Sequence, residues 1–341
     1  MKRAALNALK LGLPLAAGAW LVYKPYSALT PEQREELFAA FGQANLLWLT
    51  LAIAVGWLAH VSRAWRWRYL LEPIGYRPGF WNCYHGVMAG YFMNMFIPRA
   101  GEASRAALLY RVERVPFEKG FGTVMAERVV DMAVLLGIAG VAMVMQLDKL
   151  DLFKAQIARF RSEQGSADSV GSGFPWAWLL GALFVIGAAV AAYLVFTRPA
   201  LRARLMDALR GFMQGLQTVL RTRKKGLFVA HTVLIWACYL GMFQVGFYCL
   251  PGMDQVPFAA ILAGFIAGAI GIVLVQGGIG VYPAFVALIV GVYMVPPEGG
   301  GLLRPDALAM GWLLWAAQTL MIIVLGGLSL LLAALQKPPV P

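Results

Sequence analysis

Long apolar runs recur along this chain, and they limit its fold more than any other feature. A helix of about 20 apolar residues spans a hydrocarbon layer roughly 30 Å thick. The chain carries 60% hydrophobic and only 13% charged residues, whereas soluble domains carry about 25% charged residues. We therefore predict an all-α polytopic membrane protein with about six full transmembrane helices, in the runs Ala5–Tyr23, Leu46–Trp65, Phe121–Leu147, Trp176–Phe196, Leu227–Leu250 and Ala307–Leu335.

The first run could also be read as a signal peptide, because Lys2 and Arg3 precede it. A signal peptide ends at a cleavage site of small residues. Lys24-Pro25-Tyr26 follows the run and does not have that character. We interpret the run as a first transmembrane helix.

The formal net charge of +12 comes from basic residues that lie between apolar runs. A nucleic-acid-binding module instead places its basic residues on a polar surface, so we predict no nucleic-acid partner. Lys and Arg accumulate in cytoplasmic loops. This rule places both termini in the cytoplasm of a bacterial inner membrane, Pro31–Phe41 outside as a short amphipathic helix, and the basic segment Arg198–Lys225 inside.

A basic and aromatic group follows the second apolar run. Arg63, Arg66 and Arg68 are interleaved with Trp65 and Trp67. Cytoplasmic arginines and interfacial tryptophans are typical of the end of a transmembrane helix. We interpret this group as a topology signal rather than as a binding site.

The segment Trp81–Arg111 does not fit one complete crossing, because a crossing would place Arg105, Arg111, Arg114 and Lys119 outside. Proline and glycine interrupt a helix in the stretch from Pro98 to Glu102. We expect a re-entrant hairpin that enters the membrane, breaks at this stretch and returns to the same side. Irregular backbone at membrane depth must be buried in protein or reached by water.

Pro257–Val295 has the same character, and its break lies in the run from Gln276 to Pro283. The order of transmembrane helix, broken hairpin and transmembrane helix then occurs twice with opposite orientation. Inverted repeats with broken segments at matching places indicate a transport site near the midplane of the membrane, although glycine and proline are also common in transmembrane helices. The predicted units are residues 1–44, 45–147 (repeat 1), 148–225 and 226–341 (repeat 2), and the candidate substrate-binding residues of the second break are Gln276, Gly277, Gly278 and Gly280.

The first break has residues that suit an anionic ligand. If a helix begins near Gly101, its free backbone N–H groups attract an anion. Arg99 and Arg105 flank this point and could bind a phosphate or carboxylate in bidentate fashion. The alternative is a cytoplasmic loop whose arginines only report topology. The candidate substrate-binding residues here are Asn94, Pro98, Arg99, Gly101, Glu102 and Arg105.

Glu127, Arg128 and Asp131 form an ion cluster inside the third apolar run. An ionised side chain at the centre of a membrane helix costs roughly 2.5–3.5 kcal/mol. Residues three and four apart lie on one helix face, so this face must meet protein or water. The cluster is either a polar wall of a substrate cavity or a salt bridge that fixes helix packing.

The remaining candidates for chemistry are few. Three histidines and three cysteines lie at scattered positions without metal-ligand spacing. The chain has no phosphate-binding loop, dinucleotide fingerprint or nucleophile–base pattern. We predict no metal, no cofactor and no enzymatic activity.

These residues together resemble a known family. The run Leu71–Tyr76, the pattern Pro98-Arg99-Ala100-Gly101-Glu102 with Arg105, and Glu127-Arg128 with Asp131 are similar to the transmembrane domain of lysylphosphatidylglycerol synthases. That family includes stand-alone proteins called flippase-like. The resemblance covers nearly the whole chain and implies a membrane domain that moves modified lipid between leaflets.

The chain departs from the family pattern in two ways. It ends at Pro341, soon after the last apolar run, so we expect no aminoacyl-transferring domain and no aminoacylation of lipid. Family members often carry a glutamate shortly after the second glycine motif, where this chain has Val281-Tyr282-Pro283. A mechanism that needs an acid at the second hairpin is therefore in doubt.

We expect a translocase for an anionic phospholipid or a polyprenyl-linked lipid. The second hypothesis is a membrane partner that does not transport, and that anchors or feeds a lipid-modifying enzyme or a glycosyltransferase. A small-solute transporter and a membrane-embedded enzyme come third and last.

Overall fold

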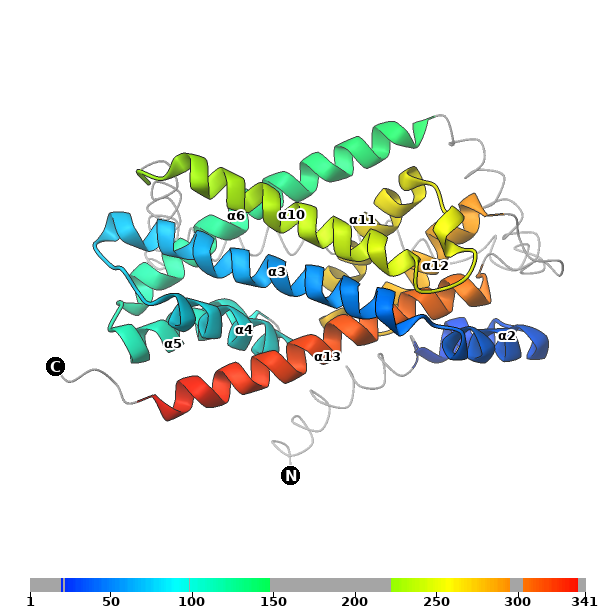
Figure 1. The fold of residues 1–341 in the computed structure, drawn as a ribbon, viewed down its shortest axis with the longest axis horizontal. Helices are drawn as coiled ribbons and strands as arrows, with labels where there is room; N and C mark the ends of the chain where they lie inside the picture. Colours follow the sequence, from blue (N-terminus) through cyan, green and yellow to red (C-terminus); the bar gives the residue numbers. More distant parts are fainter. Residues whose placement is uncertain (1–19, 21, 98, 148–221, 295–302, 337–341) are drawn as a thin grey trace, which may run out of the picture.

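The structure is a computed structural model that describes residues 20, 22–97, 99–147, 222–294 and 303–336 (Figure 1). Within these ranges the chain forms helices and connecting segments, and no strand. Most of the predicted first span Ala5–Tyr23, the whole span Trp176–Phe196 and most of the basic segment Arg198–Lys225 lie outside the described residues, as does Pro98.

Among the described residues, four helices are long and apolar enough to cross a membrane. At 1.5 Å per residue, even the shortest of them, with 23 residues, is about 35 Å long, which exceeds a hydrocarbon layer of roughly 30 Å. They confirm that the protein is a multi-pass membrane protein, and they match four of the predicted spans. The four are α3 (Leu46–Leu71), α6 (Phe117–Met145), α10 (Lys225–Phe247) and α13 (Pro305–Leu335).

Shorter helices precede the spans or join them. The predicted helix at Pro31–Phe41 is confirmed as α2 (Pro31–Gly42). It begins with a capping box, in which the Thr30 side chain accepts from the Gln33 backbone and the Gln33 side chain accepts from the Thr30 backbone. This arrangement satisfies N–H groups that a helix start leaves free. Two short 3-10 turns, η1 (Glu72–Ile74) and η4 (Met253–Gln255), follow α3 and α10.

Each pair of long helices encloses a broken pair of short ones. The first pair is α4 (Phe80–Phe96) and α5 (Ala100–Glu113), and the second is α11 (Phe258–Leu274) and α12 (Val281–Tyr293). The four short helices have 17, 14, 17 and 13 residues in chain order. The predicted interruptions are thus confirmed, and the first lies between Phe96 and Ala100, slightly before the predicted position.

Residues in the left-handed backbone conformation lie at both interruptions. Arg99 has φ 60° in the first, and Gly277, Gly278 and Gly280 have φ 67°, 70° and 73° in the second. The 3-10 turn η5 (Gln276–Gly278) occupies the second interruption. Glycine adopts this conformation without steric cost, whereas a side chain such as that of Arg99 makes it unfavourable.

The two broken pairs lie at opposite ends of the long helices (Figure 1). The first helix of each broken pair packs on the last long helix of the other half: α4 on α13, and α11 on α6. The central long helices α3 and α10 pack on each other, and α4 reaches η5. The first hairpin therefore contacts the interruption of the second.

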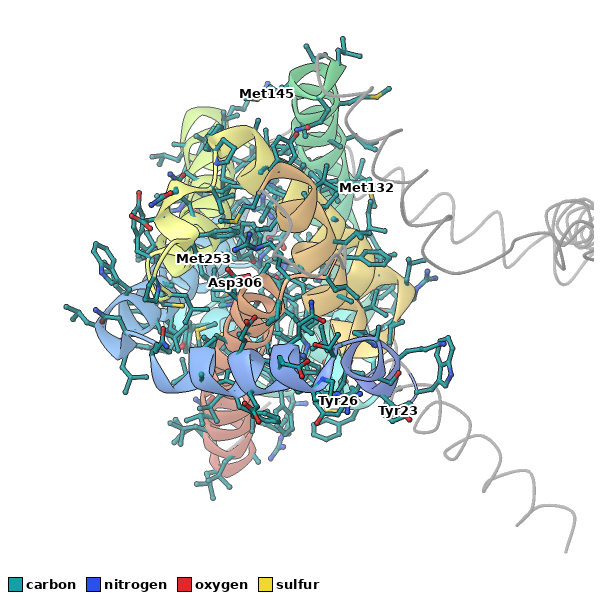
Figure 2. The ribbon with its side chains drawn as sticks, turned by 90° about the vertical axis from the view of Figure 1, so that its right-hand side faces the viewer. Tyr23, Tyr26, Met132, Met145, Met253 and Asp306 are labelled. Carbon is teal, nitrogen blue, oxygen red and sulfur yellow. The ribbon has the colours of Figure 1, made fainter. Side chains whose placement is uncertain are left out.

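Two apolar cores correspond to the two ends. One contains Trp67, Met88, Leu109 and Val124 from α3, α4, α5 and α6. The other joins α2, α11, α12 and α13 to the end of α10, and Phe247 and Leu308 are among its buried members. In the view along the bundle (Figure 2), α6 lies at the edge, where the side chains of Met132 and Met145 are exposed.

Candidate functional site

The first break begins with a close approach of α4 and α5. A Cβ at Gly101 would collide with the Gly90 backbone oxygen and with the Asn94 side chain. The Asn94 side-chain oxygen accepts from the Gly101 backbone N–H at 2.7 Å. The Asn94 side chain thus accepts from one of the N–H groups that the start of α5 would otherwise leave free. Glycine at the crossing positions, Gly90 and Gly101, lets the two helices come into contact.

Arg99 lies at the tip of this hairpin and is exposed. It directly precedes α5, and its side chain forms no ion pair or hydrogen bond with another described residue. Its neighbours Phe96 and Ile97 are 64% and 53% exposed. The tip therefore presents a cation among apolar side chains.

Arg105 lies six residues after Arg99, in the second turn of α5, and its position differs from the expectation. We expected Arg99 and Arg105 to flank one accessible anion site. Arg105 is buried at 2% exposure and its Nη1 donates to Oε2 of Glu127 on α6 at 3.0 Å. Its guanidinium also lies over the Trp67 ring at 4.2 Å. An internal carboxylate therefore pairs with Arg105, because α5 packs on α6.

Glu102 and Arg128 form a second ion pair between α5 and α6. Arg128 Nε lies 3.1 Å from Glu102 Oε1, and the Arg128 side chain is 36% exposed. The predicted cluster on α6 is therefore divided. Glu127 and Asp131 face the interior, while Arg128 pairs with the hairpin nearer the surface.

Asp131 accepts from two arginines of α3. Arg63 Nη1 donates to Oδ2 at 2.6 Å, and Arg66 Nη1 donates to Oδ1 at 2.7 Å. Arg66 Nη1 also donates to Thr232 on α10 at 3.1 Å. Both arginines are buried. The interpretation of Arg63 and Arg66 as interfacial topology signals was therefore wrong, because the face of α3 that carries them packs on α6 and α10.

A chain of aromatic hydroxyl groups continues the network towards α4. Arg63 Nη2 donates to the Tyr239 hydroxyl at 3.4 Å, and the hydroxyls of Tyr239 and Tyr91 are 3.1 Å apart. His60 is buried beside these two rings, with centroid distances of 4.6 Å to Tyr91 and 6.0 Å to Tyr239. The network thus joins α3, α4, α5, α6 and α10.

The second break is held by α13. The Gly277 carbonyl oxygen accepts from Trp315 Nε1 at 2.7 Å. A Cβ at Gly278 would lie 2.9 Å from Ile272, and Gly280 precedes the first residue of α12. The side chain of Gln276 lies outside the described residues. Because α4 contacts η5, the structure brings the helix that carries Asn94 against the second break.

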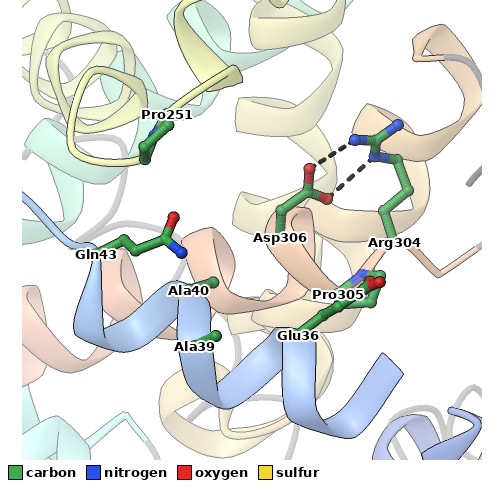
Figure 3. A pocket seen from close by; sticks show the side chains of 8 residues that line it. All are labelled: Glu36, Ala39, Ala40, Gln43, Pro251, Arg304, Pro305 and Asp306. Carbon is green, nitrogen blue, oxygen red and sulfur yellow. Dashed lines mark hydrogen bonds and ion pairs between the residues drawn. The ribbon is translucent and has the colours of Figure 1, made fainter. Parts of the chain in front are cut away.

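A cavity of about 300 Å³ lies apart from this region, between α2 and the start of α13 (Figure 3). Arg304 and Asp306 line it and form a bidentate pair at 3.0 and 2.6 Å. The hydrogen bonds to Asp306 raise the pKa of Arg304 above its ordinary value. The other lining residues are Glu36, Ala39, Ala40, Gln43, Pro251 and Pro305.

Metal-binding and thiol groups are sparse in the described ranges. No three His, Cys, Asp or Glu side chains converge there. Cys83, Cys238 and Cys249 are free and buried. His85 and His231 form side-chain hydrogen bonds with Ser329 and Ser62 at 3.1 and 2.8 Å.

Sequence reasoning missed the contribution of α3 and α10 to this network. Arg63 and Arg66 are three residues apart, and Glu127 and Asp131 are four apart. Each pair therefore lies on one helix face. Two opposite charge pairs within apolar helices are a signal that could have predicted their contact.

Comparison with protein families gives one match. The chain matches the family described as the lysylphosphatidylglycerol synthase TM region over residues 9–327. No solved structure matches the chain.

Two curated relatives match shorter segments. The UPF0104 membrane protein MJ1595 of Methanocaldococcus jannaschii is 35% identical over 95 residues, which are 27% of this chain and 28% of that protein. The glycosyltransferase AglD of Haloferax volcanii is 28% identical over 110 residues, which are 32% of this chain and 18% of that protein. The matched segments thus cover less than a third of either relative.

Proposed function

The chain belongs to the lysylphosphatidylglycerol synthase TM family, and on that premise we propose that it moves lipid between the leaflets of a bacterial inner membrane. The lipid is an anionic phospholipid or a polyprenyl-linked lipid, and the protein acts without catalysing a reaction. Its phosphate binds where the ends of the two hairpins meet, while its tails stay in the bilayer.

The observation that carries this proposal is the contact between the first hairpin and the break of the second. α4 contacts η5, so the first hairpin lies against the interrupted backbone of the other half. Transporters with inverted repeats bind substrate at broken helices near the membrane midplane. Such a contact gives a headgroup polar backbone partners at a depth where lipid offers none.

The lengths of the short helices support entry of both hairpins into the bilayer. With 14 and 13 residues, α5 and α12 are about 20 Å long, too short for a hydrocarbon layer of roughly 30 Å. The two hairpins extend from opposite ends of the long helices (Figure 1). We infer two re-entrant hairpins that open to opposite faces of the membrane.

Arg99 is the residue that we assign to the lipid phosphate. An arginine exposed to hydrocarbon costs roughly 2.5–3.5 kcal/mol, and an anionic headgroup would offset this cost. Its left-handed backbone, with φ 60°, adds a local strain that commonly marks a functional position. The exposed side chains of Phe96 and Ile97 would contact the adjoining lipid tails.

Reconstitution in liposomes tests the proposal. The purified protein would be inserted with a phosphatidylglycerol that carries a fluorescent headgroup, and a membrane-impermeant quencher would report which leaflet holds the label. We expect transport by the wild type and its loss in Arg99→Gln. Arg77→Gln is the matched control, because Arg77 is exposed in the loop before α4.

The proposal fails if the wild type transports no lipid of several headgroup classes with or without an imposed proton or sodium gradient. If Arg99→Gln transports as fast as the wild type, the assignment of Arg99 fails while transport stands.

The relative named a glycosyltransferase favours a second candidate function. The chain would then present a lipid-linked substrate to a separate glycosyltransferase without moving it. Co-purification of one such enzyme at a fixed ratio, together with an absence of transport by the chain alone, would support this function over the first.

A further inference from the structure

The buried ion network contains more positive than negative charge. The charged residues that the structure describes as buried are three arginines, Arg63, Arg66 and Arg105, and two carboxylates, Glu127 and Asp131. Arg128 and Glu102 pair with each other nearer the surface and do not alter this balance. An uncompensated charge in a protein interior costs several kcal/mol. The network is therefore one negative charge short among the described residues.

The arginines also have donors without acceptors. Arg66 is fully buried, yet its Nε and Nη2 have no hydrogen-bond partner among the described residues. The same holds for Nε and Nη2 of Arg105. Buried polar groups are normally hydrogen-bonded. These four donors therefore point to an acceptor that the described residues do not supply.

Glu127 lies between Arg66 and Arg105, the two arginines that carry these donors. Its Oε2 accepts from Arg105 at 3.0 Å, while its Oε1 has no hydrogen-bond partner and lies 4.0 Å from Arg66 Nε. Arg105 belongs to the hairpin and Arg66 to the long helix α3. A small shift of Glu127 would exchange its partner from Arg105 to Arg66.

We propose that Glu127 is an internal stand-in for a ligand phosphate, and that a headgroup with one negative charge takes its place on Arg105. This inference rests on the proposed function and names the substrate class. Arg99 receives the phosphate at the tip of the hairpin. Arg105 then binds it when α5 moves away from α6, and Glu127 turns to Arg66.

The charge balance selects the class of headgroup. One phosphodiester brings the single negative charge that the network lacks. A phosphomonoester with close to two charges would bring one too many, and a headgroup without an anion would bring none. The ligand class is therefore a phosphodiester lipid rather than a lipid monophosphate.

Two short-chain lipids that differ by one methyl group test this inference. Dihexanoyl phosphatidylmethanol is a phosphodiester with one negative charge. Dihexanoyl phosphatidic acid is a phosphomonoester, which carries close to two charges at pH 8.5. Binding of each to the full-length protein in an uncharged detergent would be measured by calorimetry. We expect the wild type to prefer phosphatidylmethanol by about thirtyfold or more, as for one buried charge left unpaired.

Two single variants change the balance by one charge each, and their combination restores it. Glu127→Gln raises the excess to two positive charges, so we expect it to prefer phosphatidic acid. Arg66→Gln balances the network without a ligand and should weaken binding of both lipids. The double variant Arg66→Gln/Glu127→Gln restores an excess of one, and should prefer phosphatidylmethanol again. Glu118→Gln is the control, because Glu118 is exposed at the start of the same helix.

Restoration by the double variant separates charge balance from damage to the fold. A purely structural role of Glu127 predicts weaker binding of both lipids in every variant, without reversal of the preference. If Glu127→Gln fails to fold, the lipid preferences of the wild type and the double variant still test the inference. Equal affinity for the two lipids in both proteins would overturn the inference.

Two further measurements separate the lipid assignment from the transport function. Competition by chloride or inorganic phosphate at the lipid concentration would show that the site takes a free anion, which would overturn the lipid assignment. Transport by the wild type combined with an unchanged preference in Glu127→Gln would refute this inference and leave the proposed function intact. The predicted change of preference without any transport would refute the function and leave the anion site.

Discussion

Replacing Asp131 by asparagine removes the carboxylate that joins α3 to α6 and keeps its volume. Asp131 accepts two charge-assisted hydrogen bonds, from Arg63 at 2.6 Å and from Arg66 at 2.7 Å. Both arginine side chains are at most 2% exposed. Breaking a buried pair leaves a charge without compensation and costs about 3–5 kcal/mol. We expect the free energy of unfolding to fall by about that amount.

Unfolding in mixed micelles, titrated with a denaturing detergent, measures this loss. Glu72→Gln is the matched control, because it breaks an ion pair with Lys224 at 2.9 Å whose side chains are 27% and 45% exposed. An exposed pair contributes about 0–1 kcal/mol. The double variant Arg63→Gln/Asp131→Asn should lose less than the sum of its two single variants, because both residues share one network.

A loss of less than about 1 kcal/mol in Asp131→Asn would equal that of an exposed pair and would refute this reasoning. It would mean that water or another group compensates Arg63 and Arg66, and that the network is not a buried connection between α3 and α6.

Three further predictions concern single positions. Gly101→Ala places a Cβ against Gly90 and Asn94, so we expect loss of transport and a lower yield of folded protein. Gly137→Ala on α6 meets nothing within 4 Å, and its yield should equal that of the wild type. Gly277→Ala, at φ 67°, should cost about 1–2 kcal/mol in the same unfolding titration, and an unchanged stability would contradict the left-handed turn. Thr30→Ala removes the cap of α2 and should lower stability by about 1 kcal/mol, whereas Thr30→Ser should not.

The long helices and the breaks were predictable because their signals are local. An apolar run of sufficient length predicts a span, and Gly277, Gly278 and Gly280 predict an interruption. Helix ends were less predictable. The second span continues to Leu71 rather than ending at Trp65, because Arg66 finds buried partners in Asp131 and Thr232 and does not need water.

The ion network was not predictable in full because its partners are distant in sequence. Asp131 lies 68 residues after Arg63 and 65 residues after Arg66. A rule that counts arginines in loops assigns each one without reference to a partner, so it placed these two at the membrane surface. Arg105 was misplaced for the same reason, since its partner Glu127 belongs to another helix.

The central claim is that two hairpins enter the bilayer from opposite faces and meet at the lipid site. Labelling of single cysteines tests it most directly. Arg77→Cys lies before α4 and Asp254→Cys lies before α11, at exposed positions, and the native cysteines are buried. With a membrane-impermeant maleimide on intact cells and on inverted vesicles, we predict labelling of Arg77→Cys from the cytoplasmic side and of Asp254→Cys from the outer side. Labelling of both from the same side would contradict the opposed hairpins and the account built on them.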